Sequence, residues 1–460
     1  MDQDKKNKYF FGLGTVGRDM FYAFESNAMI YFLSNILELP LTTFAMVSLV
    51  LTILRVFDAL NDPITGLIID NIRSPWGKYK PPMLVGALLA VVFYLIMFAD
   101  FGLTGIKYVL VFGAAYILWD ISYGINDIAY WSMMPSLTLD QKKRENFGAF
   151  ARICANIGMY IVMVGYPSFT AMLGGGKKGY FALAVIVSVL MIGFQLFTIL
   201  GVRENKTQFK EEENVSLKDM FHVLFTNDQL MWVTLAMALF TVGYISTTNF
   251  ARYYMQYIYC DIDKYTILAA ACGVAQLAAL IIFPLVSKLF NRKTFYAVST
   301  VIVVIGYIIF FFADSSLLLI ALGAIVIFVG EAFIQLLMLM FISDTIEYGQ
   351  WKLGKRNDSI TFSIQPLINK IGGAMATGIV SITLVLSGIK HGDVAAEAID
   401  STGKLIFKNS MLVVPLILIV LGYYIYSKKF TLNEEKFAQI VSELKERGDI
   451  VDEAKEEAHE

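Results

Sequence analysis

Residues 41–69 read LTTFAMVSLVLTILRVFDALNDPITGLII, an apolar stretch that carries an arginine, an asparagine and two aspartates in its second half. About 20 apolar residues in a helix cross the ~30 Å hydrocarbon core of a bilayer, so this stretch is long enough to span a membrane. A charged side chain inside such a span costs about 3 kcal/mol or more. The stretch therefore predicts a membrane-spanning helix whose charges serve either function or an internal ion pair.

The rest of the chain has the same apolar character. Of its 460 residues, 57% are hydrophobic and only 17% are charged, and its mean hydropathy is +0.61. Soluble domains carry roughly 25% charged residues. The apolar residues form runs long enough to span a bilayer, which predicts an all-α, polytopic membrane protein. The net charge of −2 identifies no partner, and we expect no nucleic acid to bind.

Cysteine and histidine form no metal or redox motif in this sequence. Cys154 and Cys272 lie in apolar runs and Cys260 lies at the end of one, as expected of small buried side chains. The three histidines fall outside the predicted spans. We therefore expect no cofactor, and no metal apart from a bound coupling ion.

Twelve apolar runs predict twelve membrane-spanning helices in two sets of six. The predicted helices lie at about 10–37, 41–70, 82–99, 105–134, 148–171, 180–201, 229–258, 265–288, 294–312, 316–343, 357–387 and 409–427. The predicted regions are an N-terminal six-helix bundle (1–202), a central loop (203–228), a C-terminal six-helix bundle (229–430) and a tail (431–460). Apolar residues recur at helical spacing in the tail and predict a short amphipathic helix there.

Lysine and arginine concentrate in alternate loops, and this bias sets the orientation of a membrane protein. The residues concerned are Lys5, Lys6, Lys8, Arg73, Lys78, Lys80, Lys142, Lys143, Arg144, Arg203, Lys206, Lys210, Lys218, Lys288, Arg292, Lys293, Lys352, Lys355 and Arg356. We expect both termini and the central loop to lie in the cytoplasm. Two six-helix halves joined by a cytoplasmic loop are the layout of the major facilitator fold, which binds substrate near the membrane midplane.

The charged residues of the second predicted helix suggest a cation site. Asp58 and Asp62 are four residues apart and share one face of the helix, with Asn61 alongside and Pro63 loosening the turn. Two close carboxylates hold either a cation or a proton, because both cannot stay charged cheaply without one. The alternative is structural, with Arg55 neutralising Asp58.

The fourth predicted helix carries an aromatic stripe around an acid. Trp119, Tyr123, Asp127 and Trp131 follow one another at intervals of four residues. Helix packing explains the aromatic residues but not the aspartate. Aromatic faces beside a carboxylate suit a sugar, whose C–H faces stack on rings and whose hydroxyl groups bond to the acid.

Further ionisable residues lie within the first and fifth predicted helices. Asp19 is far enough along its helix to lie inside the membrane. Arg152 is either a cation of the site, reaching Asp19 and Asp127, or a side chain that extends to the cytoplasmic surface.

The second half of the chain contributes Gln365, Asn369 and Lys370 from the eleventh predicted helix. Lys370 lies near the middle of its span and needs an acidic partner. Glu331 and Gln335 in the tenth predicted helix are further candidates.

Several motifs together resemble the glycoside–pentoside–hexuronide:cation symporters, the family of melibiose permease. The resemblance covers essentially the whole chain. The stretches that carry it are GLGTVGRD (12–19), RVFDALNDPITG (55–66), NDIAYWSMMPSLTLDQKKRE (126–145) and SDTIEYGQWKLGKRNDSITFSIQPLINKIGG (343–373).

The resemblance implies a role for each matching residue. Asp58, Asn61 and Asp62 fall on the cation-site positions of the family. Its sugar-site positions are matched by Asp19, Asp127, Trp131, Arg152, Gln365 and Lys370, with Tyr123 nearby.

The sequence departs from the family pattern at two places. Melibiose permease adds a threonine hydroxyl to the cation site, whereas Gly124 stands at that position here. A sodium site then lacks a ligand or recruits water or Asn126, which favours H⁺ without excluding Na⁺. Glu25 stands where an uncharged residue is expected in the first helix.

These observations predict a monomeric symporter of the cytoplasmic membrane that imports a glycoside, pentoside or hexuronide with Na⁺ or H⁺. The partners expected are the sugar, the monovalent cation and membrane lipid. An exporter or sensor of another small molecule on the same fold is the alternative. An enzyme is not expected, because the sequence has neither large soluble loops nor a nucleotide or metal signature.

Overall fold

The computed structural model describes residues 3–204, 223, 225–262, 264–313, 316–388 and 400–450, with the side chains of residues 48, 52, 53 and 55–60 outside the description. Helices account for nearly all of the described chain, and they fall into two compact units. The predicted all-α membrane architecture is confirmed. Most of the central loop and the last ten residues of the tail lie outside the described residues.

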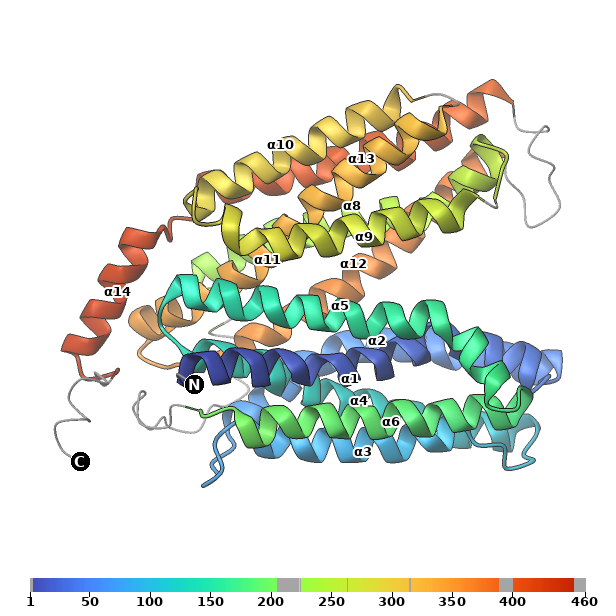
Figure 1. Cartoon of the computed structure of the whole chain (residues 1–460), viewed down its shortest axis with the longest axis horizontal. Helices are drawn as coiled ribbons and strands as arrows, with labels where there is room; N and C mark the ends of the chain where they lie inside the picture. Colours follow the sequence, from blue (N-terminus) through green and yellow to red (C-terminus); the bar gives the residue numbers. More distant parts are fainter. Residues whose placement is uncertain are drawn as a thin grey trace. The chain divides into compact units, whose positions relative to one another are not determined.

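The first unit comprises Met1–Phe221 together with Gly354–Ile364 and Val441–Glu460. Its long helices run alongside one another (Figure 1). They are α1 (Gln3–Tyr31), which continues into the π-helical turn η1 (Phe32–Ile36), α2 (Leu41–Asp70), α3 (Lys80–Phe98), α4 (Gly105–Leu137), α5 (Gln141–Met172) and α6 (Gly176–Gly201).

Glycines allow α1 to pack closely against two neighbours in this unit. A Cβ atom at Gly17 of α1 would lie 2.3 Å from the Leu190 carbonyl oxygen of α6. A Cβ atom at Gly158 of α5 would lie 2.2 Å from the Val16 carbonyl oxygen of α1. Small residues are what allow backbones to approach this closely inside a membrane. The contacts fix the position of the adjacent Arg18 and Asp19.

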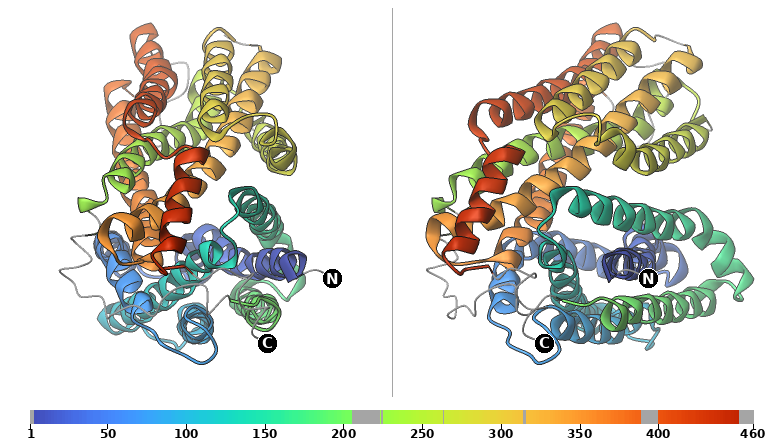
Figure 2. Two further views of the ribbon diagram at one scale, coloured as in Figure 1. Left: turned by 90° about the vertical axis from the view of Figure 1, so that its left-hand side faces the viewer. Right: turned by 60° about the vertical axis from the view of Figure 1, so that its left-hand side comes forward.

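The second unit comprises His222–Leu353 and Gln365–Ile440, and Figure 2 shows its helices from two further sides. They are α8 (Asp228–Tyr253), which continues into the π-helical turn η2 (Tyr254–Ile258), α9 (Lys264–Val286), α10 (Arg292–Phe311), α11 (Leu317–Leu353), α12 (Asp358–Leu386), α13 (Ser401–Lys429) and α14 (Glu434–Glu446). The first turns of α12 and the end of α14 belong to the first unit.

Ten helices of the described residues are long and apolar enough to cross a membrane. They are α3 to α6 and α8 to α13, with α8 extended by η2. Helix α1 is equally long but carries Arg18, Asp19 and Glu25 in its middle, and the described apolar part of α2 is Leu41–Leu51.

Several helices extend beyond their predicted ends. The helix predicted at 148–171 begins at Gln141, and the one predicted at 409–427 begins at Ser401. Each start has an aspartate N-cap, because Asp140 accepts hydrogen bonds from the Lys142 and Lys143 amides and Asp400 accepts one from Gly403. Apolar runs mark the part of a helix that prefers lipid, whereas caps mark where it ends.

The predicted amphipathic helix of the tail is present as α14. Its Phe437, Ile440 and Leu444 side chains are buried, at the spacing that the sequence indicates.

Candidate functional site

The centre of the candidate site is an ion-paired cluster between α1 and α4. The Arg18 guanidinium lies 3.1 Å from the Asp19 carboxylate and 3.0 Å from the Asp127 carboxylate. The Arg18 side chain is only 2% exposed, whereas those of Asp19 and Asp127 are 23% and 25% exposed. One buried cation therefore holds two acids whose outer edges remain accessible.

Arg152 of α5 adds a second guanidinium beside this cluster. Its central carbon lies 4.5 Å from the centre of the Trp131 ring, and that of Arg18 lies 5.3 Å from the same ring. Trp131 therefore contacts both arginines, an arrangement that stabilises cations over an aromatic face. The structure thus brings together Asp19, Asp127, Trp131 and Arg152, all named from the sequence.

The predicted aromatic stripe of α4 divides into a packed part and an accessible part. Trp119 is buried in the core and stacks on Tyr123, with ring centres 5.8 Å apart. Tyr123 also stacks on Tyr22 of α1 at 5.4 Å, and Tyr22 is 46% exposed. Packing accounts for Trp119, while Tyr22 and Tyr123 offer ring surface near the acids.

The sequence reasoning missed two residues of this cluster, Arg18 and Tyr22. Arg18 directly precedes Asp19, so it was visible as a charge within a span. Adjacent helical residues point in different directions, and spacing alone does not show that Arg18 faces Asp127 on another helix.

The predicted cation site is described in part. Asp62 of α2 is 1% exposed and Asn61 is half-buried, while the Asp58 side chain lies outside the description. A Cβ atom at Gly124 of α4 would lie 3.8 Å from the Asp62 Oδ1 atom. Gly124 therefore faces Asp62, and a hydroxyl-bearing residue there would point toward its carboxylate.

Asn126 does not replace the missing hydroxyl. Its side-chain nitrogen donates a hydrogen bond to the Met83 carbonyl of α3 at 2.6 Å, and its oxygen accepts one from Gln195 of α6 at 3.1 Å. The side chain is completely buried in these contacts. Recruitment of Asn126 to the cation site is therefore disfavoured.

The three candidate residues of α12 belong to the second unit, and Asn369 is exposed. Gln365 is buried and Lys370 is half-buried. They are thus not among the residues that the first unit brings together around Arg18.

The C-terminal end of α2 contacts the start of α12. The Asp70 carboxylate accepts hydrogen bonds from the Ser359 and Ile360 amides at 3.1 and 3.0 Å and pairs with Lys78 at 2.8 Å. A Cβ atom at Gly66 would lie 2.6 Å from the Ser359 carbonyl oxygen. Gly66 and Asp70 together hold the first turn of α12, where a negative charge favours the helix N-terminus.

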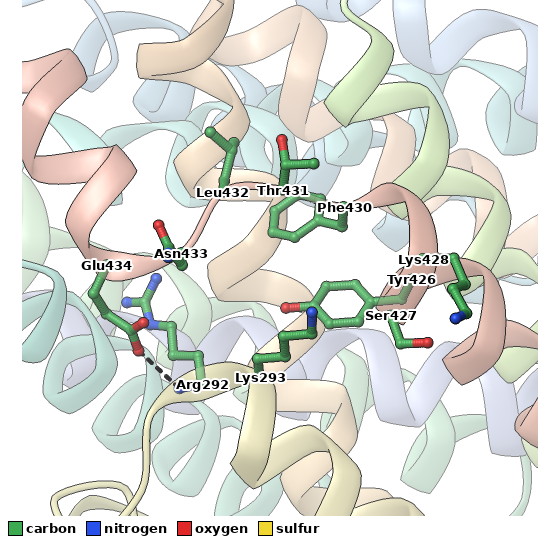
Figure 3. Close-up of a pocket in the computed structure, with 10 residues that line it drawn as sticks. All are labelled: Arg292, Lys293, Tyr426, Ser427, Lys428, Phe430, Thr431, Leu432, Asn433 and Glu434. Carbon is green, nitrogen blue, oxygen red and sulfur yellow. Dashed lines mark hydrogen bonds between the residues drawn. The ribbon is translucent and has the colours of Figure 1, made fainter.

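A pocket of about 300 Å³ lies in the second unit, where α10, α13 and α14 meet (Figure 3). The Glu434 carboxylate accepts a hydrogen bond of 2.8 Å from the Arg292 amide at the start of α10 (Figure 3). The Arg292 guanidinium pairs with Asp344 of α11. None of the predicted sugar or cation residues lines this pocket, and its contacts attach α14 to the bundle.

Apolar helices that surround a buried, ion-paired cluster with accessible carboxylate edges define a membrane transporter. The chain belongs to the family described as MFS/sugar transport protein, whose model matches residues 10–434. The predicted major facilitator fold and the resemblance to sugar transporters of this class are confirmed. The family consists of transporters rather than enzymes, and this chain is a multi-pass membrane protein.

Characterised relatives share the sequence over nearly its full length. A lactose permease of Lactobacillus delbrueckii subsp. bulgaricus is 33% identical, and the match covers 94% of this chain and 71% of the permease. A raffinose carrier protein of Pediococcus pentosaceus is also 33% identical, covering 95% of this chain and 71% of the carrier.

Solved structures show the same fold at much lower sequence identity. The transporter FucP in its outward conformation superposes with a TM-score of 0.65 at 13% identity. The match covers 90% of this chain and 98% of FucP.

Proposed function

We propose that this protein is a cation-coupled symporter that imports a sugar across the cytoplasmic membrane by alternating access, with both termini in the cytoplasm. The observation that carries the proposal is the cluster of Arg18, Asp19 and Asp127 beside accessible aromatic rings. Arg18 pairs with both carboxylates, and their exposed oxygens can accept hydrogen bonds from sugar hydroxyl groups.

The other residues of the cluster complete a sugar site in this proposal. Arg152 donates hydrogen bonds from a guanidinium held against Trp131. Tyr22 and Tyr123 present stacked ring surface to the apolar face of the sugar ring. Gln365 and Lys370 are proposed to join from the second unit when the two halves close around substrate.

Coupling is proposed to occur at Asp58, Asn61 and Asp62 of α2. The Asp62 carboxylate is 1% exposed, and burial at this depth favours the uptake of a cation or a proton. The position that faces it, Gly124, supplies no side-chain oxygen, which favours H⁺ over Na⁺. Cation binding and sugar binding then strengthen each other by the same factor, as linkage requires.

Transport in proteoliposomes tests this function. The purified protein is reconstituted and loaded with unlabelled sugar, and uptake of labelled sugar is followed across a panel headed by lactose and raffinose, the sugars in the names of its relatives. We expect counterflow of at least one sugar, and uphill uptake driven by a pH gradient with or without Na⁺. Absence of cation-dependent sugar movement across the panel would contradict the proposal.

A further inference from the structure

Glu331 is a carboxylic acid in the middle of the membrane-spanning helix α11 that the proposed sugar and cation sites do not use. Its side chain is 1% exposed. The neighbouring Gly330 packs against α10, where a Cβ atom would lie 2.9 Å from the Ser299 carbonyl oxygen. The close approach of the two helices keeps Glu331 inside the second unit.

No cation is placed to neutralise this acid among the residues that the structure describes. The titratable groups that interact electrostatically with Glu331 are the Cys272 thiol of α9 and the Tyr307 hydroxyl of α10. From α8, the Thr247 hydroxyl bonds to that of Tyr307, and Tyr244 packs on Phe328, one turn before Glu331. All of these groups are neutral.

The hydrogen bonds around Glu331 do not compensate for an ionised carboxylate either. Its Oε1 atom is buried without a hydrogen-bond partner within the described structure. An unpaired carboxylate in such surroundings is penalised by several kcal/mol or more, and a group in this position takes up a proton instead.

We propose that Glu331 is a proton site of the transport cycle. Glu331 carries a proton while α8 to α11 are packed as described, and its O–H bond breaks when the packing opens and water can accept the proton. This part of the proposal rests on the proposed symport. It assigns to the second unit a titrating acid separate from Asp58 and Asp62.

The protonated state can be tested on the purified full-length protein without transport. Infrared difference spectra are recorded as pH is raised, with all variants made in an Asp62→Asn background so that the buried Asp62 carboxyl does not contribute. They are expected to show the C=O band of a buried protonated carboxyl group. Glu331→Gln should remove this band, and Glu38→Gln, at an exposed acid outside the spans, should leave it. Persistence of the band in Glu331→Gln would overturn the assignment, whether or not any sugar is transported.

The role in the cycle is tested in proteoliposomes. Glu331→Gln is expected to keep sugar counterflow but to move one proton fewer with each sugar than wild type. Wild-type proton movement and an unchanged pH profile in this variant would show an acid that stays protonated throughout, and would overturn the proposal. If Glu331→Gln does not fold, Glu331→Asp replaces it. We then expect a shifted C=O band and a shifted pH profile, and wild-type behaviour in both would overturn the proposal.

Discussion

Arg18 lies between two acids, and removing it would take away the cation that pairs directly with both of them. The effect of breaking such a cluster depends on which member is removed, because the remaining charges lose their compensation. Asp19 and Asp127 each retain about a quarter of their exposure, so water can reach them. The Arg18 side chain is only 2% exposed, so water does not solvate its guanidinium in the same way.

Arg18→Gln should therefore destabilise the protein and abolish sugar binding. We expect the free energy of unfolding to fall by about 3 kcal/mol, at the low end for a broken buried pair because water partly solvates the acids. Thermal unfolding in detergent measures the loss, and sugar counterflow measures binding and exchange. Arg18→Lys keeps the charge and serves as the control. Wild-type stability in Arg18→Gln would show that the pairing contributes little.

Gly124 allows the choice of coupling ion to be tested with a matched pair of variants. Gly124→Ser places a hydroxyl group toward Asp62, whereas Gly124→Ala adds the Cβ atom without an oxygen. We expect stimulation of uptake by Na⁺ at fixed pH to be greater in the serine variant than in the alanine variant. Equal stimulation in the two variants would mean that the hydroxyl is not a ligand.

At the scale of helices, the position of the candidate site depends on how α1 is held between α5 and α6. Hydropathy predicts that these helices exist, and spacing predicts which residues share a face of one helix. Neither predicts which helices meet, which is why Asp127 was recognised and its partner Arg18 was not. For the same reason, the sequence did not distinguish Trp119, which is buried in the packed core, from the more accessible aromatic residues of the stripe.

Two glycine-to-alanine variants distinguish close packing from helix propensity. Gly17→Ala should destabilise the protein by about 1–3 kcal/mol, because the new Cβ atom meets the α6 backbone. Gly193→Ala, in α6 itself, meets no atom within 4 Å and should be neutral or stabilising by roughly 0.5–1 kcal/mol. Thermal unfolding measures both, and a Gly17→Ala variant as stable as Gly193→Ala would refute the tight contact.

At the scale of the molecule, the proposed coupling implies that a change at α2 alters sugar movement across the whole transporter. The sequence alone predicts two sets of six helices, because apolar runs and basic loops are long-range patterns. The Asp70 contact to the start of α12 does not, because it joins residues almost 290 positions apart in the chain.

Asp62→Asn should separate uphill uptake from exchange. The amide is neutral without binding a cation or a proton, so accumulation driven by an ion gradient should be lost. Counterflow of labelled sugar, which needs no gradient, should remain measurable. Both assays are run on the same proteoliposomes, and concentrative uptake at the wild-type level would rule out the coupling role of Asp62.

The attachment of residues 354–364 to the first unit has a consequence for biosynthesis. Chains emerge from the ribosome N-terminus first, and domains generally fold in that order. Here Asp70 and Gly66 are inserted early, but the Ser359 and Ile360 amides that Asp70 binds are made only after α8 to α11. The nascent first unit therefore lacks residues 354–364, and Asp70 lacks these two hydrogen bonds, until most of the second unit has been synthesised. A fragment that ends in the central loop would lack residues 354–364 permanently, and Asp70 would never form these hydrogen bonds.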